Sequence, residues 1–111
     1  MMSNPNNMNR AKALIAKHLT EIILKEIKDP KIGFVSVNEV EVSSDLGVAK
    51  VYVSFLGTKN KNENLKHLVA ASGYIRSSLA KVLKMKKTPE LRFFLDDSFD
   101  KYEHLNELLK H

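Results

Sequence analysis

The chain has 111 residues, no cysteine, and a net charge of +5 from 18 basic and 13 acidic side chains. The length fits one domain, and the lack of cysteine excludes disulfides, thiol catalysis and cysteine-ligated zinc or iron–sulfur sites. Short apolar runs exclude a transmembrane helix and the polar N-terminus lacks a signal-peptide core, so we expect a cytoplasmic protein.

The first element is a predicted helix. Asn, Ser and Pro dominate residues 1–8, which we expect to be a disordered tail preceding a single domain of residues 9–111. Apolar residues then recur at helical spacing from Asn9 to Lys28, about five turns. Arg10, Lys17 and Lys28 fall together on the side away from the apolar stripe. Asp29-Pro30 is expected to stop this helix.

Two strands follow, joined by a turn. Phe34 to Val42 is rich in valine, and its alternation changes phase near Asn38-Glu39, which predicts a β-bulge. Apolar and polar residues alternate cleanly from Ala49 to Phe55. The turn composition of residues 43–47 predicts that the two strands form an antiparallel hairpin.

Two consecutive helices come after a polar loop at residues 57–64. The first begins at Leu65 and the second continues through Ile75. We predict a break between them in Ala70-Ala71-Ser72-Gly73, because Ser72 can cap a helix and a mid-helix Gly73 costs about 1 kcal/mol against alanine. Tyr74, with Ser77, Lys81 and Lys84, is expected on the exposed side of the second helix.

Leu91 to Leu95 alternates as a third strand, beginning after Thr88-Pro89. Asp96-Asp97-Ser98 is a helix-start signal for a short terminal helix, which we expect to cover the apolar Phe94. The order α-β-β-α-α-β plus a C-terminal helix indicates an α+β fold, a three-stranded sheet packed on helices.

Positive charge is concentrated in two segments. Residues 59–92 carry +7 and residues 1–37 carry +3, whereas residues 38–58 and 93–111 are acidic. This distribution is typical of polyanion binding, although lysines exposed for solubility would produce it too. The cluster Lys84 to Lys87 likewise suits either a helix C-terminus or contact with phosphates.

The sequence contains no convincing catalytic or metal-binding constellation, and we expect no cofactor. No histidine pair has the i, i+4 spacing of a helical metal site, and His18 is interpreted as a packed residue. Asp96 and Asp97 resemble paired carboxylates, but adjacent residues at a strand end point apart and N-capping explains one of them. Of the tyrosines, Tyr52 is expected to pack in the sheet, while Tyr74 remains a candidate for base stacking.

The element order is that of the type II KH fold, a single-stranded nucleic-acid module. Such domains carry Gly-x-x-Gly between the consecutive helices, where this chain has Ala71-Ser72-Gly73. With that departure, the sequence resembles the ribosome-binding factor A family over roughly residues 8–110. The motifs that carry the resemblance are Ile27-Lys28-Asp29-Pro30, Val40 to Leu46, Ala49 to Val53, Ala71 to Arg76, Thr88 to Phe93 and Asp96-Asp97-Ser98. Lys86 stands where the family often has arginine, and lysine cannot make a bidentate contact.

The resemblance implies a non-enzymatic assembly factor that binds the immature 30S ribosomal subunit and its 16S rRNA. It implies a role in late maturation, including 5′-end processing, that matters most in the cold. We expect a monomer with no small-molecule substrate. The candidate RNA-binding residues are Arg10, Lys17, Lys28, Ser72, Gly73, Tyr74, Arg76, Lys81, Lys84, Lys86, Lys87 and Arg92. Ser72-Gly73 is either a site where the backbone approaches a phosphate or a plain break between helices, and Asp29-Pro30 and Asp45 are assigned to turns.

Three alternatives stay open. The chain could be a protein-interaction module in ribosome or RNA metabolism, which contacts a partner through its sheet edge and acidic terminal helix. A small hydrolase using Asp96 and Asp97 is a second interpretation. Binding of the first helix to a membrane surface is a third, and it conflicts with the need for that helix's apolar face in the core.

Overall fold

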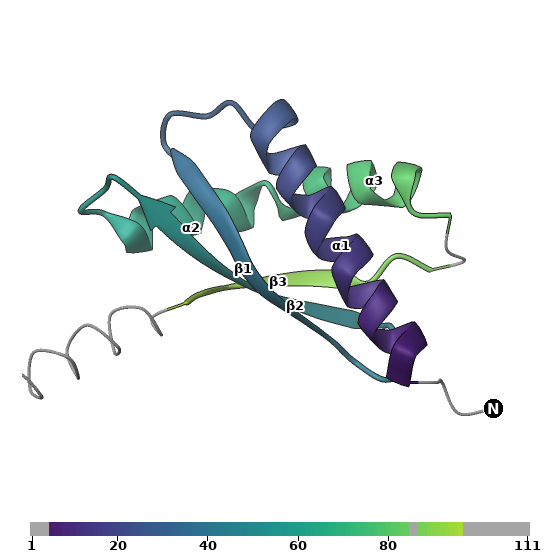
Figure 1. The fold of residues 1–111 in the computed structure, drawn as a ribbon. Helices are drawn as coiled ribbons and strands as arrows, with labels where there is room; N and C mark the ends of the chain where they lie inside the picture. Colours follow the sequence, from purple (N-terminus) through teal and green to yellow (C-terminus); the bar gives the residue numbers. More distant parts are fainter. Residues whose placement is uncertain (1–4, 85–86, 97–111) are drawn as a thin grey trace, which may run out of the picture.

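The computed structural model describes residues 5–84 and 87–96, with side chains from Met8 onward. It has the predicted α+β architecture (Figure 1). The predicted terminal helix and most of its start signal lie outside the described residues. The elements are α1 (Pro5–Glu26), β1 (Phe34–Val42), β2 (Val48–Leu56), α2 (Lys61–Ala70), α3 (Ser72–Val82) and β3 (Glu90–Leu95).

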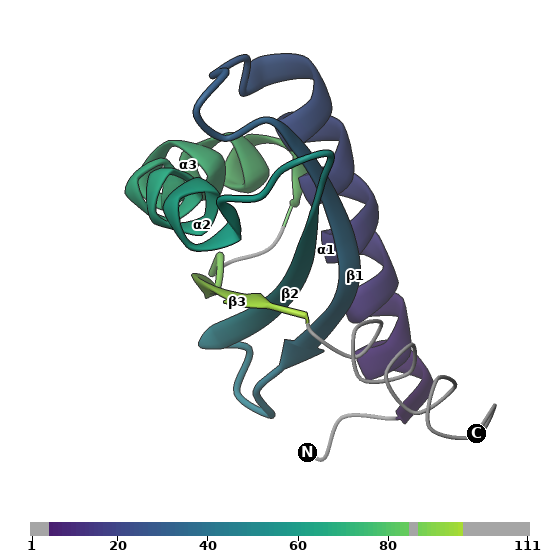
Figure 2. The same cartoon turned by 90° about the vertical axis from the view of Figure 1, so that its left-hand side faces the viewer.

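The sheet has three strands in the order β1-β2-β3. β1 and β2 pair antiparallel across the turn at residues 43–47, as predicted. β3 pairs parallel to β2, a connection that requires a crossover, and α2 and α3 supply it. The two crossover helices follow one another in nearly the same direction (Figure 1, Figure 2).

The predicted β-bulge is confirmed. The register between β1 and β2 shifts between Val37 and Glu39, so Asn38 is the extra residue. The shift keeps Val35, Val37 and Val40 on the side of the helices, where Val40 is buried and the other two pack against the core. Without the extra residue, the valines on one side of the bulge would face away from the core.

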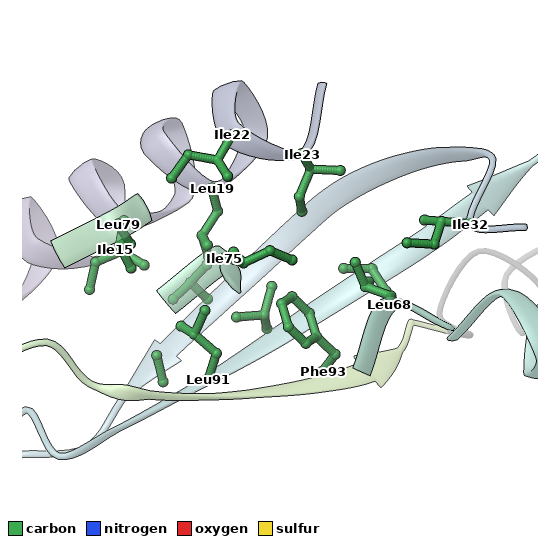
Figure 3. Close-up of a cluster of buried hydrophobic side chains, with 14 of the residues drawn as sticks. Ile15, Leu19, Ile22, Ile23, Ile32, Leu68, Ile75, Leu79, Leu91 and Phe93 are labelled. Carbon is green, nitrogen blue, oxygen red and sulfur yellow. The ribbon is translucent and has the colours of Figure 1, made fainter. Parts of the chain in front are cut away.

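All three helices pack on one face of the sheet. The alternating residues of β2, Ala49, Val51, Val53 and Phe55, are buried there as expected. The apolar stripe of α1 meets them, and Leu91 and Phe93 of β3 close the same cluster (Figure 3). The buried members from α1 are Ile15, Leu19, Ile22 and Ile23.

Several helix ends differ from the prediction. α1 ends at Glu26, two residues before Lys28, and α2 begins at Lys61, inside the segment predicted to be a polar loop. α1 begins at Pro5, so Pro5 to Met8 are helical and not part of a tail. Proline is tolerated in the first turn because the N–H that it lacks would have no intrahelical partner there. The predicted break between α2 and α3 is confirmed, since it falls at Ala71, inside the predicted segment Ala70 to Gly73. α3 ends at Val82, because Leu83 is extended and buried.

The start of α2 is tied to the turn after α1 by a buried amide. Asn64 Nδ2 donates to the carbonyl oxygen of Lys31 at 2.7 Å, and Thr58 Oγ1 donates to Asn64 Oδ1 at 2.8 Å. Gly33 completes that turn with a φ of +71°, a conformation that favours glycine. Within the described residues, no helix is long and apolar enough to cross a membrane.

Candidate nucleic-acid interface

The predicted basic stripe on α1 is only partly formed. Arg10 and Lys17 are exposed and lie two turns apart on one side of the helix. Lys28 is exposed too, but it follows the last residue of α1 and lines a hollow with Leu24 and Phe34. The expected extension of the stripe to Lys28 is therefore wrong, because the helix ends at Glu26.

The junction between α2 and α3 presents a small, open surface. Gly73 is exposed, and a Cβ added there would meet nothing within 4 Å. Ser72 is half-buried and does not cap α3: Ala71 is the N-cap residue, and no side chain caps this helix. The prediction that Ser72 acts as the cap is wrong because the helix begins one residue earlier.

Tyr74 keeps an exposed ring but not a free hydroxyl. The residue is 55% exposed, which agrees with its predicted place on the exposed side of the helix. Tyr74 Oη donates a hydrogen bond to Glu26 Oε1 at 2.8 Å, and the buried Ser78 donates to the same oxygen from Oγ at 3.0 Å. The last residue of α1 is therefore joined to α3 by two hydrogen bonds.

Arg76 is tied to the backbone that leads into β3. Its Nη2 donates to the carbonyl oxygen of Thr88 at 2.8 Å, and its Nε donates to that of Pro89 at 3.2 Å. Arg76 and Thr88 also line an open hollow of about 400 Å³ together with Lys87. The structure thus brings two of the predicted cations, Arg76 and Lys87, to one place.

The lysine cluster extends past the helix. Lys81 lies in the last turn of α3, but Lys84 follows the helix end, and Lys87 belongs to the next segment. All three are exposed, and Lys86 lies outside the described residues. Attraction to a helix C-terminus accounts for Lys81 and the nearby Lys84 but not for Lys87, since this effect falls off beyond the helix end.

Asp45 is a turn residue, as predicted. The hydroxyl of Ser43 and the N–H of Gly47 donate to Asp45 Oδ1 at 2.7 and 2.9 Å. These hydrogen bonds are the main cause of a pKa of Asp45 below its ordinary value, and Lys87 lowers it further by a smaller Coulombic effect. Asp29 likewise accepts from the N–H of Lys31 within the turn after α1.

Arg92 is not part of the surface formed by the helices. It pairs in register with Lys50 of β2, on the face of the sheet away from the helices, which we call the outer face. Arg92 Nη2 lies 3.1 Å from Glu90 Oε2 in an ion pair. The expected grouping of Arg92 with the lysines near α3 is therefore wrong, because strand alternation turns its side chain the other way.

Two aromatic rings stack on the outer face. The centroids of Tyr52 and Phe94 lie 5.7 Å apart at an interplanar angle of 29°, which confirms the expected packing role of Tyr52. Burial and, to a lesser degree, Glu41 raise the pKa of Tyr52. Further along this face, Asn38 Nδ2 donates to Asp96 Oδ2 at 2.8 Å.

The candidate catalytic and metal-binding residues do not form a site among the residues that the structure describes. No group of three His, Asp or Glu side chains there could hold a metal ion. His18 is half-buried, with Nδ1 3.7 Å from Glu21 Oε2 on the next turn of α1. Asp97, which the sequence suggested as a catalytic partner of Asp96, lies outside the described residues.

Comparisons with known proteins agree with the resemblance. The family model described as ribosome-binding factor A matches residues 7–109. Ribosome-binding factor A of Halothermothrix orenii is 48% identical over 98 residues, covering 87% of this chain and 80% of the relative. That of Thermodesulfovibrio yellowstonii is 43% identical over 101 residues, covering 91% and 86%.

Solved structures give the same result. The crystal structure of ribosome-binding factor A from Thermus thermophilus superposes with a TM-score of 0.71 at 26% identity, covering 79% of this chain and 94% of that one. A Thermus thermophilus homology model fitted into the cryo-EM map of a 30S–RbfA complex has a TM-score of 0.65 at 26% identity. It covers 78% of this chain and 91% of its own.

Proposed function

Because this chain belongs to the ribosome-binding factor A family, we propose that it binds the small, 30S ribosomal subunit during its assembly. The similarity to a ribosome-binding factor A fitted into a 30S complex supports this proposal. So does the concentration of positive charge, +7, in residues 59–92. A polyanion such as ribosomal RNA is the partner that such a charge distribution favours.

The finer role is proposed on the same basis. The protein contacts 16S rRNA and assists late maturation of the subunit, including processing of the RNA 5′ end, with its greatest effect in the cold. It acts in the cytoplasm as a monomer, without a cofactor, a small-molecule substrate or catalysis. A factor without chemistry of its own acts by binding one state of the subunit more tightly than another, and so shifts the population toward that state.

The observation that carries the RNA-binding proposal is the exposure of cations on the helical side of the molecule. They come from α1, from the last turn of α3 and from the segment that follows α3, and Gly73 at the start of α3 is exposed as well. Phosphate contacts of this kind give affinity with little sequence selectivity. The proposed contact residues are Arg10, Lys17, Ser72, Gly73, Tyr74, Lys81, Lys84, Lys86 and Lys87, with Lys28, Arg76 and Arg92 as more distant or partly engaged candidates.

Sedimentation through sucrose gradients tests the proposal. We expect the protein to travel with free 30S subunits and not with complete ribosomes. The affinity for isolated small-subunit RNA should fall steeply between about 50 and 200 mM salt, because phosphate binding releases counterions. An affinity that is flat across this range would contradict direct RNA contact.

A protein-interaction module remains the second candidate, and the outer face of the sheet favours it. Phe34 and Leu56 pair there and are 75% and 60% exposed, and Phe94 is 40% exposed. Glu39 and Glu41 lie on the same face, so this face is less suited to RNA than the helical side. Binding to 30S subunits with salt-insensitive affinity would support this second candidate.

A further inference from the structure

Glu26 occupies a position that α1 itself does not favour. It is the last residue of the helix, where the helix dipole is negative and a carboxylate is destabilising. Residues that contradict local preferences in this way often serve the tertiary structure or a function. The hydrogen bonds that the Glu26 carboxylate accepts come from the neighbouring helix, from Tyr74 and Ser78.

The start of α3 lacks a negatively charged group of its own, and Glu26 supplies one. Its first turn contains no acidic residue, and Ala71 at the N-cap provides no side-chain hydrogen bond. A negative group near the beginning of a helix is favourable. The carboxylate of Glu26 reaches the third residue of α3, Tyr74, from another part of the chain.

From this geometry we propose that Glu26 is a positioning residue for the RNA-binding surface. By accepting hydrogen bonds from Tyr74 and Ser78, it fixes the exposed ring of Tyr74 and the first turn of α3 against α1. The inference rests on the proposed function, because it assigns Glu26 a role in presenting that surface to RNA.

The two hydrogen bonds have different effects. Ser78 is 8% exposed, so its bond anchors the carboxylate close to the core. Tyr74, a residue that is 55% exposed, is held at the hydroxyl end of its side chain, which restricts the movement of its ring. An aromatic ring that is already ordered loses less entropy when a base stacks on it, and so binds more tightly.

Two substitutions at Glu26 separate positioning from charge. Glu26→Ala removes both hydrogen bonds, whereas Glu26→Gln keeps an oxygen that accepts them and removes only the charge. Glu21→Ala is the matched control, since Glu21 lies on the same helix and contacts His18 of that helix. Binding to purified 30S subunits is measured by co-sedimentation, and the ¹³Cζ chemical shift of Tyr74 reports the hydroxyl hydrogen bond.

We expect Glu26→Ala to weaken 30S binding about three- to tenfold, because the ring of Tyr74 is then no longer held in place before it binds. Its salt dependence should stay unchanged, and Glu26→Gln and Glu21→Ala should bind like the wild type. The Tyr74 signal should shift more in Glu26→Ala, which loses the acceptor, than in Glu26→Gln, which keeps a weaker one. Denaturant titration of each variant checks that the folded fraction is the same in the binding assay.

Three other results would overturn the proposal. Wild-type binding by Glu26→Ala would show that the fixed ring does not matter to the subunit. Tighter binding by both Glu26 variants would show that the carboxylate acts by repelling phosphate. An unchanged Tyr74 signal in Glu26→Ala would show that Glu26 does not fix the ring. This measurement does not involve 30S subunits, so its result is distinct from a failure of the wild type to bind them, which would contradict the proposed function.

Discussion

Arg76 donates a hydrogen bond from Nη2 to the carbonyl oxygen of Thr88 at 2.8 Å, which joins α3 to the segment entering β3. A second bond, from Nε to Pro89, lies beside it. This guanidinium therefore holds a loop as well as carrying a charge. Its neighbour in the same hollow, Lys87, depends on that loop for its position.

Replacing Arg76 should cost stability. We expect Arg76→Ala to lower the free energy of unfolding by about 1 to 3 kcal/mol, because two carbonyl oxygens lose a charged donor. Arg92→Ala is the matched control and should cost less than about 1 kcal/mol, since its pair with Glu90 is exposed on both sides. Urea denaturation measures both. Equal costs for the two variants would contradict the bridging role of Arg76.

Gly73→Ala separates the two interpretations of the helix junction. An alanine has room there and α3 is helical, so the substitution should stabilise the fold by up to about 1 kcal/mol. If the backbone approaches a phosphate at this point, the same variant should bind 30S subunits several-fold more weakly. A variant with raised stability and undiminished binding would show a plain break between helices.

Gly33→Ala is the control for that experiment. Gly33 has a φ of +71°, so the added methyl group should strain the turn and cost about 1 to 2 kcal/mol. The opposite signs expected at the two glycines follow from backbone conformation alone. Thermal denaturation of both variants under one condition compares them.

Charge reversal tests the lysines around the end of α3. Changing Lys81, Lys84, Lys86 and Lys87 to Glu should leave the fold intact and release the protein from 30S subunits, because attractive phosphate contacts become repulsive. Lys50→Glu is the control for net charge, because Lys50 lies on the outer face. It changes the net charge as much as Lys81→Glu does, and it should weaken 30S binding less than that single variant. Undiminished co-sedimentation of the fourfold variant would exclude these lysines as the binding surface.

Asp45 should give the fold an acid-sensitive contribution. The pKa of its carboxyl lies below 3.8 in the folded protein, chiefly because of the Ser43 hydroxyl. The ionised group therefore stabilises the fold above the ordinary value, and this contribution is lost as pH falls through the lowered one. Asp45→Asn should weaken the dependence of the unfolding free energy on pH below about 4.

A carboxyl ¹³C titration measures that pKa directly. Ser43→Ala removes the main stabilising hydrogen bond, so it should move the pKa of Asp45 upward toward 3.8. Titration of Asp45 at or above that value in the wild-type protein would show that the turn hydrogen bonds do not form in solution.

Local patterns predicted the sheet well because strand alternation is a short-range property. The shift of phase at Asn38 was enough to place the bulge, and the run from Ala49 to Phe55 identified the buried face. The candidate site was harder to predict, since it depends on which element each cation belongs to. Lys28 lies outside the helix because α1 ends at Glu26, and Arg92 lies on the outer face because of its position in the alternation of β3.

The contacts made by Glu26 and Arg76 had no signal in the sequence. Each joins residues at least twelve positions apart, and each uses a charged side chain that a helical pattern assigns to solvent. The amide of Asn64 is a similar case, since it reaches the backbone of Lys31 from α2. Such bonds depend on how the helices and loops pack together, which local sequence patterns do not specify.

The bulge at Asn38 also affects the tendency of the protein to aggregate with other molecules of the same chain. β1 is an edge strand, and a regular edge offers unpaired backbone groups on which a second molecule can add a strand and begin aggregation. The extra residue interrupts that regular pattern and increases the local twist. The bulge that keeps the valines of β1 on the core side therefore also makes strand addition at this edge less favourable when the protein is concentrated and has no partner bound.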